Sequence, residues 1–290
     1  MAGKPRRVII TRPAQDAAHW VKELTNNGFN AQALPLIEIG PASGKADILI
    51  LQDTFQRLAE YAAAMFVSGN AVQYFFQQKK AADQLKPVQS ALEYIAEEAF
   101  DTLPPNLRFF APGPATAAAL RAAGVPATQI DSPSPDSGQF DSEALWQVVG
   151  SRDWHAKRVL LLRGLTHGVA APSAAGRDWL TQQLRAAGAR VDMVTVYERR
   201  SPQLSSAQID WVKEASHDCS VWLFSSSEAL ANLMQQPLLA GVDWSEACAI
   251  ATHPRIAQAV RAAGGGVVQE SRPLLSDIVT ALRSIESSDS

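Results

Sequence analysis

The sequence has few features typical of exported, membrane-spanning or metal-binding proteins. Its two cysteines, Cys219 and Cys248, have no metal-ligand neighbour at useful spacing, and we expect both to be buried, reduced thiols. Basic residues occur in Met1–Arg7, but the apolar run behind them is only Val8–Ile10, whereas a signal peptide needs about 7–15 apolar residues. No stretch approaches the roughly 20 apolar residues of a membrane span. We therefore expect a cytoplasmic protein that has no membrane partner.

Strong charge blocks and the usual cofactor motifs are also missing. The formal net charge is -3, with 26 basic and 29 acidic side chains spread along the chain, so nucleic acid is not expected as a partner. No G-x-G-x-x-G follows a predicted strand, and Gly44-Lys45 lacks the rest of a phosphate loop. No serine lies in a G-x-S-x-G frame. Because His, Cys and carboxylate clusters at metal spacing are missing too, we expect no cofactor and no metal.

Alternating apolar and amphipathic segments make up most of the chain. With 290 residues, 47% of them hydrophobic, the chain suits two domains with cores of their own. Short apolar runs followed by helical patterns predict α/β architecture with parallel sheets. Strands are predicted at Val8–Thr11, Ala64–Ser68, Phe109–Ala111, Val159–Leu162, Val191–Glu198, Val221–Phe224, Ala249–Ala251 and Val267–Val268, with a short one ending at Ile130. Helices are predicted from Pro13 to Asn27, at Asn70–Lys79, at Thr116–Ala123, from Asp141 to Val149, at Ser173–Ala187, and after each of the last three strands.

Two parts of the sequence echo each other, which indicates a repeated domain. AMFVSGNAVQYF from Ala64 is similar to VWLFSSSEALANL from Val221, and both predict a strand, a polar turn and a helix. Two extended segments, Ala33–Ile39 and Val191–Glu198, are candidates to pair and connect the domains. This gives domain 1 as residues 1–34 plus 200–290, domain 2 as residues 40–192, and linker strands at 35–39 and 193–199. A single cut near residue 150 is the alternative.

Polar loops after the predicted strands are the candidate ligand site. Ligands of open parallel sheets bind beyond the carboxyl ends of the strands, where helix N-termini offer free N–H groups to anions. Ordinary turns and helix caps favour the same residue types, so capping alone is the alternative explanation of each loop. His253 suits a surface or capping role. Six such loops in two matched halves nevertheless favour a polar cleft. The candidate binding residues are Arg12, Ser68, Asn70, Gly113, Thr116, Arg163, Gly164, Ser225, Ser226 and Thr252, with Arg255 as a further cation.

Tyr197 is the sharpest candidate for chemistry. It is one of four tyrosines and lies in the second extended segment. Its phenol can donate or accept a hydrogen bond, and its ring is apolar. We predict that Tyr197 faces the cleft between two lobes; a tyrosine packed at a domain junction is the alternative.

Nine short motifs, in order and spacing, resemble those of one enzyme family over nearly the whole chain. They are TRPAQ from Thr11, PLIEI from Pro35, FVSGNAV from Phe66, PGPATAAAL from Pro112, DSEAL from Asp141, LLLRG from Leu160, GARVDMVTVYER from Gly188, FSSSEAL from Phe224 and ATHPRIA from Ala251. Together they resemble the uroporphyrinogen-III synthases, although no single motif is diagnostic because the family diverges strongly. Residues 80–107 look like an insertion relative to that family.

The resemblance implies two flavodoxin-like α/β domains joined by a two-stranded β linker. It also implies a monomeric lyase of tetrapyrrole biosynthesis that acts on hydroxymethylbilane without cofactor or metal. By motif, Tyr197 matches the family's linker tyrosine, its leading acid candidate, and Thr116 matches a threonine that faces the cleft. Ser68 and Thr252 match polar positions at helix starts.

Two other functions share parts of this pattern. A two-lobed binding protein without catalysis has similar architecture, but such proteins are usually exported. A nucleotide-using transferase needs a phosphate loop or an acidic metal motif, and the sequence shows neither.

Overall fold

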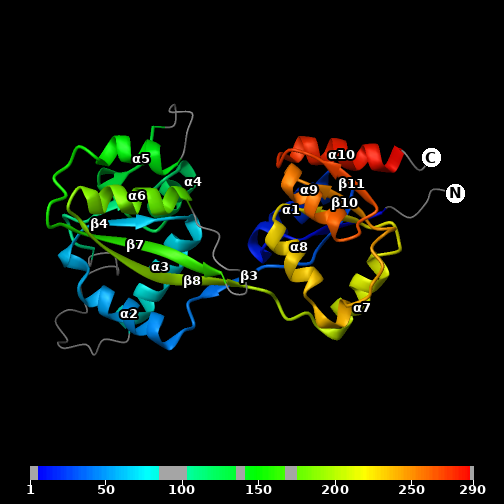
Figure 1. Cartoon of the computed structure of the whole chain (residues 1–290), viewed down its shortest axis with the longest axis horizontal. Helices are drawn as coiled ribbons and strands as arrows, with labels where there is room; N and C mark the ends of the chain where they lie inside the picture. The colour runs from blue at the N-terminus through cyan, green and yellow to red at the C-terminus, as the bar shows by residue number, and fades with distance from the viewer. Residues whose placement is uncertain (1–5, 85–102, 135–140, 167–174, 288–290) are drawn as a thin grey trace. The chain divides into compact units, whose positions relative to one another are not determined.

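The computed structural model describes residues 6–84, 103–134, 141–166 and 175–287 (Figure 1). The chain divides into two compact units. Unit 1 consists of Met1–Ile39 and Arg200–Ser290, and unit 2 consists of Gly40–Arg199. Both units are α/β, as the alternating pattern predicts.

Unit 1 is built on a five-stranded, wholly parallel sheet. Its strands are β1 (Arg7–Ile10), β2 (Asn30–Ala33), β9 (Val221–Phe224), β10 (Cys248–Ala251) and β11 (Val267–Glu270), in the order β2-β1-β9-β10-β11. This is the 2-1-3-4-5 order of flavodoxin-like folds. One apolar cluster joins the sheet to α1 (Ala14–Asn26) and α10 (Leu275–Ser287). A second joins it to α7 (Ser206–Ala215), α8 (Ser227–Met234) and α9 (Pro254–Ala262), so helices cover both faces.

Unit 2 is built on a six-stranded sheet. Its strands are β3 (Glu38–Pro41), β4 (Tyr61–Phe66), β5 (Arg108–Phe110), β6 (Ile130–Asp131), β7 (Arg158–Thr166) and β8 (Arg190–Arg200), in the order β3-β8-β7-β4-β5-β6. Neighbouring strands from β8 to β6 pair in parallel. The helices are α2 (Lys45–Gln56), α3 (Gly69–Gln84), α4 (Pro114–Ala122), α5 (Ser142–Val149) and α6 (Ala175–Ala186). Figure 1 shows α5 and α6 on one face of this sheet and α2 and α3 on the other.

The two sheets share one spatial order but differ in chain order. If β3 is set aside, β8-β7-β4-β5-β6 corresponds to β2-β1-β9-β10-β11. The strand pair that comes first in unit 1 therefore comes last in unit 2, as in a circular permutation. The two similar sequences fit this relation, because one begins at Ala64 in β4 and the other at Val221 in β9. These two strands occupy corresponding positions in the two sheets.

Several local predictions are confirmed. The strand at Val221–Phe224 has the predicted bounds. Asp141 caps α5, because its side chain accepts a hydrogen bond of 2.8 Å from the Ala144 N–H. Gly28 follows α1 with a φ of +90°, a conformation that glycine adopts without strain.

Other expectations need correction. Ala33–Ile39 is not one extended segment, because β2 ends at Ala33 and β3 begins at Glu38. The predicted strand Val191–Glu198 belongs to the longer β8, which has β7 on one side and β3 on the other. Two helices, α2 and α7, were not predicted. Of the 80–107 segment, residues 85–102 lie outside the described residues, as does the predicted helix start at Ser173.

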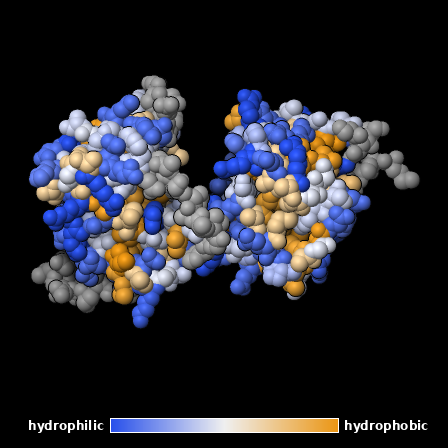
Figure 2. Space-filling view, viewed as in Figure 1, coloured by the Kyte–Doolittle hydropathy of each residue, from blue (hydrophilic) through white to orange (hydrophobic). Residues whose placement is uncertain are grey.

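Helix α2 leaves apolar side chains at the surface. Ile48, Leu49 and Ile50 are 38%, 56% and 49% exposed. Figure 2 shows apolar surface in the part of unit 2 where Figure 1 places α2. Within the described residues, short 3₁₀ turns occur at Leu58–Glu60, Ala127–Gln129 and Pro237–Leu239. Among the described residues, no helix combines the length and apolarity needed to cross a bilayer.

Candidate functional site

The strongest constellation in unit 2 lies at the carboxyl end of three neighbouring strands, β8, β7 and β4. Tyr197 belongs to β8, Gly164 to β7, and Ser68 lies two residues after the end of β4. The Tyr197 hydroxyl lies 3.3 Å from Ser68 Oγ. Ser68 Oγ also accepts a 3.3 Å hydrogen bond from the Ala71 N–H in the first turn of α3. Three residues that the sequence predicted as site residues are thus in direct contact.

A bulge in β8 determines where the Tyr197 ring points. Thr195 pairs with Arg163, but the next pair along the strands is Tyr197 with Gly164, so Val196 is an extra residue. The ring then lies on Gly164. A Cβ added to Gly164 would lie 2.3 Å from Tyr197 Cζ, so only glycine leaves room for the ring.

Helix α3 supports Tyr197 from the other side. The Tyr74 and Tyr197 rings stack with centroids 6.1 Å apart and planes inclined by 23°. Tyr197 is 5% exposed, so its hydroxyl has little contact with water and depends on protein groups or a ligand for hydrogen bonds. A buried phenol beside a serine hydroxyl is a compact donor and acceptor pair that suits proton transfer to a bound molecule.

The other unit 2 candidates lie on nearby loops and helix starts. Thr116, 6% exposed, is in the first turn of α4, and Gly113 is that helix's N-cap residue with extended backbone. Asn70 is half-buried in the first turn of α3, whereas the Arg163 side chain is exposed. These residues lie at the edge that carries Tyr197, but the contact group itself is Ser68, Gly164 and Tyr197.

Unit 1 carries its own set at the carboxyl ends of β1, β9 and β10, which are neighbours in the sheet. Ser226 caps α8 by accepting a 3.2 Å hydrogen bond from the Glu228 N–H, next to Ser225. Thr252 follows β10, and its N–H donates to the Phe224 carbonyl at 3.0 Å. Ordinary capping chemistry thus accounts for part of this set.

His253 and Arg255 are exposed at the start of α9. His253 Nδ1 accepts the Arg255 N–H at 3.1 Å. The capping interpretation of His253 is therefore confirmed.

Arg12 is the best-positioned cation of unit 1. Its guanidinium carbon lies 4.7 Å from the centre of the Trp20 ring, a cation–π arrangement that holds the group in place. Arg12 Nε is buried and has no hydrogen-bond partner among the described residues. Burial lowers the pKa of Arg12, and the charge of Asp16 opposes this change. A held cation with an unused donor is suited to a carboxylate.

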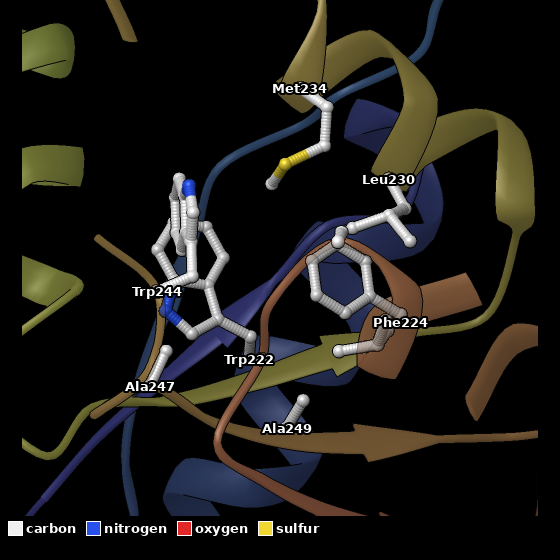
Figure 3. A pocket seen from close by; sticks show the side chains of 10 residues that line it. Trp222, Phe224, Leu230, Met234, Trp244, Ala247 and Ala249 are labelled. Atoms are coloured by element: carbon white, nitrogen blue, oxygen red, sulfur yellow. The ribbon is translucent and has the colours of Figure 1, made fainter. Parts of the chain in front are cut away.

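An apolar recess on the α8 and α9 face of unit 1 is a separate feature (Figure 3). Its volume is about 20 Å³, and the side chains that line it include Trp222, Phe224, Leu230, Met234 and Trp244. These residues belong to or pack on the apolar core of that face. The recess holds no charged group, so it does not suit a polyanionic ligand.

Sequence reasoning missed Tyr74 and Gln78 beside the candidate site. Both are on α3 at i and i+4, the spacing that places side chains on one helix face. That spacing was the available signal. In the part of the chain that the structure describes, no three His, Cys, Asp or Glu side chains group to hold a metal ion.

Comparison with known families shows to which family the chain belongs. The family model described as "Uroporphyrinogen-III synthase HemD" matches residues 18–280. The chain belongs to the uroporphyrinogen-III synthase family. A curated uroporphyrinogen-III synthase from Chlorobaculum parvum is 34% identical over 86 residues, 29% of this chain and 32% of that protein. The matched stretch thus spans about a third of that relative's length.

A solved structure of the same family shares the fold. A mutant uroporphyrinogen III synthase from Thermus thermophilus matches with a TM-score of 0.51 and 15% identity, over 98% of this chain and 99% of that one. The match to the Helicobacter pylori uroporphyrinogen-III synthetase covers 98% of this chain and 100% of that chain, with 16% identity and a TM-score of 0.43. At such identities, the first match supports the fold alone.

Proposed function

We propose that this protein is a uroporphyrinogen-III synthase, a lyase that closes hydroxymethylbilane into uroporphyrinogen III with inversion of ring D and release of water. The observation that carries the proposal is the buried Tyr197 phenol, held on Gly164 and beside Ser68 in a member of this family. The proposed enzyme is a monomer that acts on a small molecule.

The proposed reaction begins with loss of the terminal hydroxyl of the bilane. Tyr197 donates a hydrogen bond or proton to the departing oxygen, which leaves as water, and loss of the pyrrole N–H proton gives an electrophilic azafulvene. The substituted α-carbon of ring D then attacks the methylene carbon of the azafulvene, and the new carbon–carbon bond gives a spiro intermediate. That intermediate opens and recloses with the ring inverted. General-acid assistance of this kind contributes about 10²–10⁴ in rate.

Geometry supplies the rest of the proposed catalysis. The intermediates react readily, so the protein chiefly needs to hold the two ends of the substrate in the productive arrangement. In this proposal the Ser68 hydroxyl donates to the Tyr197 oxygen across their 3.3 Å contact, which leaves the phenol O–H for the substrate.

The acetate and propionate groups of the substrate need cationic or N–H partners. We assign them to the helix N-termini at Asn70, Gly113 and Ser226, with Thr116, Ser225 and Thr252 as hydroxyl partners. Arg12, Arg163 and Gly164 complete the proposed set. Local sites are needed because a net charge of -3 gives no long-range attraction for an anion.

The test is the substitution Tyr197→Phe, which removes the hydroxyl and keeps the ring. We expect turnover to fall by about 10²-fold or more, while the thermal unfolding midpoint stays close to that of the parent protein. The matched control is Tyr61→Phe in the same sheet, whose hydroxyl donates to Asp192 instead. Unchanged turnover in the Tyr197 variant removes its catalytic role.

A further inference from the structure

The β8 bulge is required for the placement of Tyr197, because side chains alternate between the faces of a strand. In regular pairing, Val196 would lie opposite Gly164, and Tyr197 would point to the other face of the sheet. The extra residue therefore puts the phenol on Gly164 and beside Ser68. A β-bulge interrupts the ladder and leaves backbone groups that need other partners.

Gln78 supplies a partner to that bulge. Its Nε2 donates to the Val196 carbonyl at 2.8 Å. The same carbonyl accepts the Ala42 N–H at 3.3 Å. Val196 is fully buried, so without the Gln78 amide this carbonyl would keep the longer bond from the Ala42 N–H and lose the shorter of its two hydrogen bonds. The bulge is thus held by a side chain of α3 and by the residue that follows β3, the strand next to β8.

The same amide also donates to the backbone of the residue whose ring packs on Tyr197. Gln78 Nε2 lies 3.1 Å from the Tyr74 carbonyl, one helical turn earlier. The Tyr74 ring stacks on Tyr197. One amide group therefore connects the bulge residue before Tyr197 with the helix turn that packs on its ring.

We propose that Gln78 is a positioning residue for Tyr197: it holds the Val196 bulge, and with Tyr74 it sets the orientation of the phenol. The inference rests on the proposed function, because it assigns Gln78 a role in a reaction that Tyr197 assists. Gln78 acts through Tyr197 and has no chemical step of its own.

The test compares Gln78→Met with Gln77→Met in the full-length protein. Methionine keeps the length of the side chain and removes the amide donor, and Gln77 is an exposed residue of the same helix. For Gln78→Met we expect kcat to fall about 10–100-fold, as for a misplaced catalytic group, with KM within about twofold because ground-state binding is kept. For Gln77→Met we expect both parameters to match the parent protein.

A double-mutant cycle with Tyr197→Phe separates positioning from general support of the fold. If Gln78 acts through the phenol, Gln78→Met should change turnover less than about twofold once the hydroxyl is gone. An equal loss in both backgrounds contradicts the inference and leaves the proposed function intact. If Tyr197→Phe itself leaves turnover unchanged, the proposed role of Tyr197 fails first.

A second pair of variants keeps the test decisive if Gln78→Met does not fold. Tyr74→Phe retains the stacked ring, and Tyr74→Leu removes it. We expect kcat to fall at least about fivefold further for leucine than for phenylalanine, and this difference should vanish in the Tyr197→Phe background. Equal kcat values for the two Tyr74 variants overturn the positioning role.

Discussion

At the scale of single residues, the close approach of the Tyr197 ring to the β7 backbone is what places the phenol. Gly164 is required there for space, since an added Cβ would overlap the ring. The tyrosine, the glycine and Ser68 form one contact unit from three strands or strand ends. The catalytic proposal therefore depends on a residue that has no side chain.

Gly164→Ala should displace the Tyr197 ring. We expect a loss of stability of about 1–3 kcal/mol from overpacking and a fall in turnover close to that of Tyr197→Phe. Chemical denaturation and steady-state kinetics measure the two effects. Gly241→Ala is unsuitable as a control because Gly241 has a φ of +81°. Gly69→Ala is a suitable control, because the added Cβ would meet only the Ala119 Cβ, at an ordinary contact distance of 3.9 Å. Parent-like turnover in Gly164→Ala contradicts the placement.

Much of this residue set was predictable. Ser68 and Gly164 follow from the polar loops after the predicted strands, and Tyr197 follows from its place in the second extended segment. Their mutual contact, and the roles of Tyr74 and Gln78, could not be predicted, because one extra residue in β8 reverses which side chains face the site. A strand's sequence does not reveal a bulge when the neighbouring residues are all apolar or buried, as Val194, Val196 and Tyr197 are.

At the scale of elements, Asp131 joins β5, β6 and the segment after α5. Its carboxylate receives hydrogen bonds from Arg108 and Arg152, and it is 7% exposed. Burial alone would raise the pKa of Asp131, but the hydrogen bonds and charges of Arg152 and Arg108 outweigh it and lower the pKa. This edge of the unit 2 sheet is therefore held by a buried, doubly paired carboxylate.

Acid should weaken this edge of the sheet. Because the folded-state pKa is depressed, the Asp131 contribution to stability is complete above the unfolded pKa of about 3.9 and is lost as pH falls below it toward the folded pKa. Asp131→Asn should lower the free energy of unfolding at pH 7 by about 2–3 kcal/mol, and its stability should fall less than the parent's below about pH 4. Urea unfolding across pH measures both.

The control for Asp131 is Asp53→Asn, whose partner Arg57 forms an exposed pair. We expect a change below about 0.5 kcal/mol there. Equal effects of the two substitutions would remove the special role of Asp131.

Secondary structure was predictable where periodicity or capping was clear. Helix α7 has a capping box between Ser205 and Gln208, a signal that sequence reasoning overlooked. Helix α2 gave no clear signal. Four of its large apolar residues form the continuous run Ile48–Leu51, of which only Leu51 is buried, so the run does not show in the sequence which side chains face the core.

At the scale of the whole molecule, the two units repeat one sheet order with a permuted chain order. The chain begins unit 1, passes through all of unit 2, and then completes unit 1. The repeat was visible in the sequence, but the permutation was not, because strand order comes from pairing rather than from motif order. The linker bounds at 35–39 and 193–199 stay a prediction.

Unit 2 has its own core and should fold alone. All residues of the cluster that joins its sheet to α5 and α6 lie inside residues 40–199. We expect a fragment of residues 40–199 to unfold in one cooperative thermal transition but to give no turnover, since Arg12, Ser226 and Thr252 are missing. A fragment without a cooperative transition, or one with full activity, contradicts this account.

The central claim is that the protein steers how the ends of hydroxymethylbilane meet. The most direct measurement is to incubate the purified protein with this substrate, oxidise the products, and resolve the porphyrin isomers. The account predicts mostly type III product, in contrast to the type I product of spontaneous closure in the buffer control. A type I product at the rate of that control would contradict it.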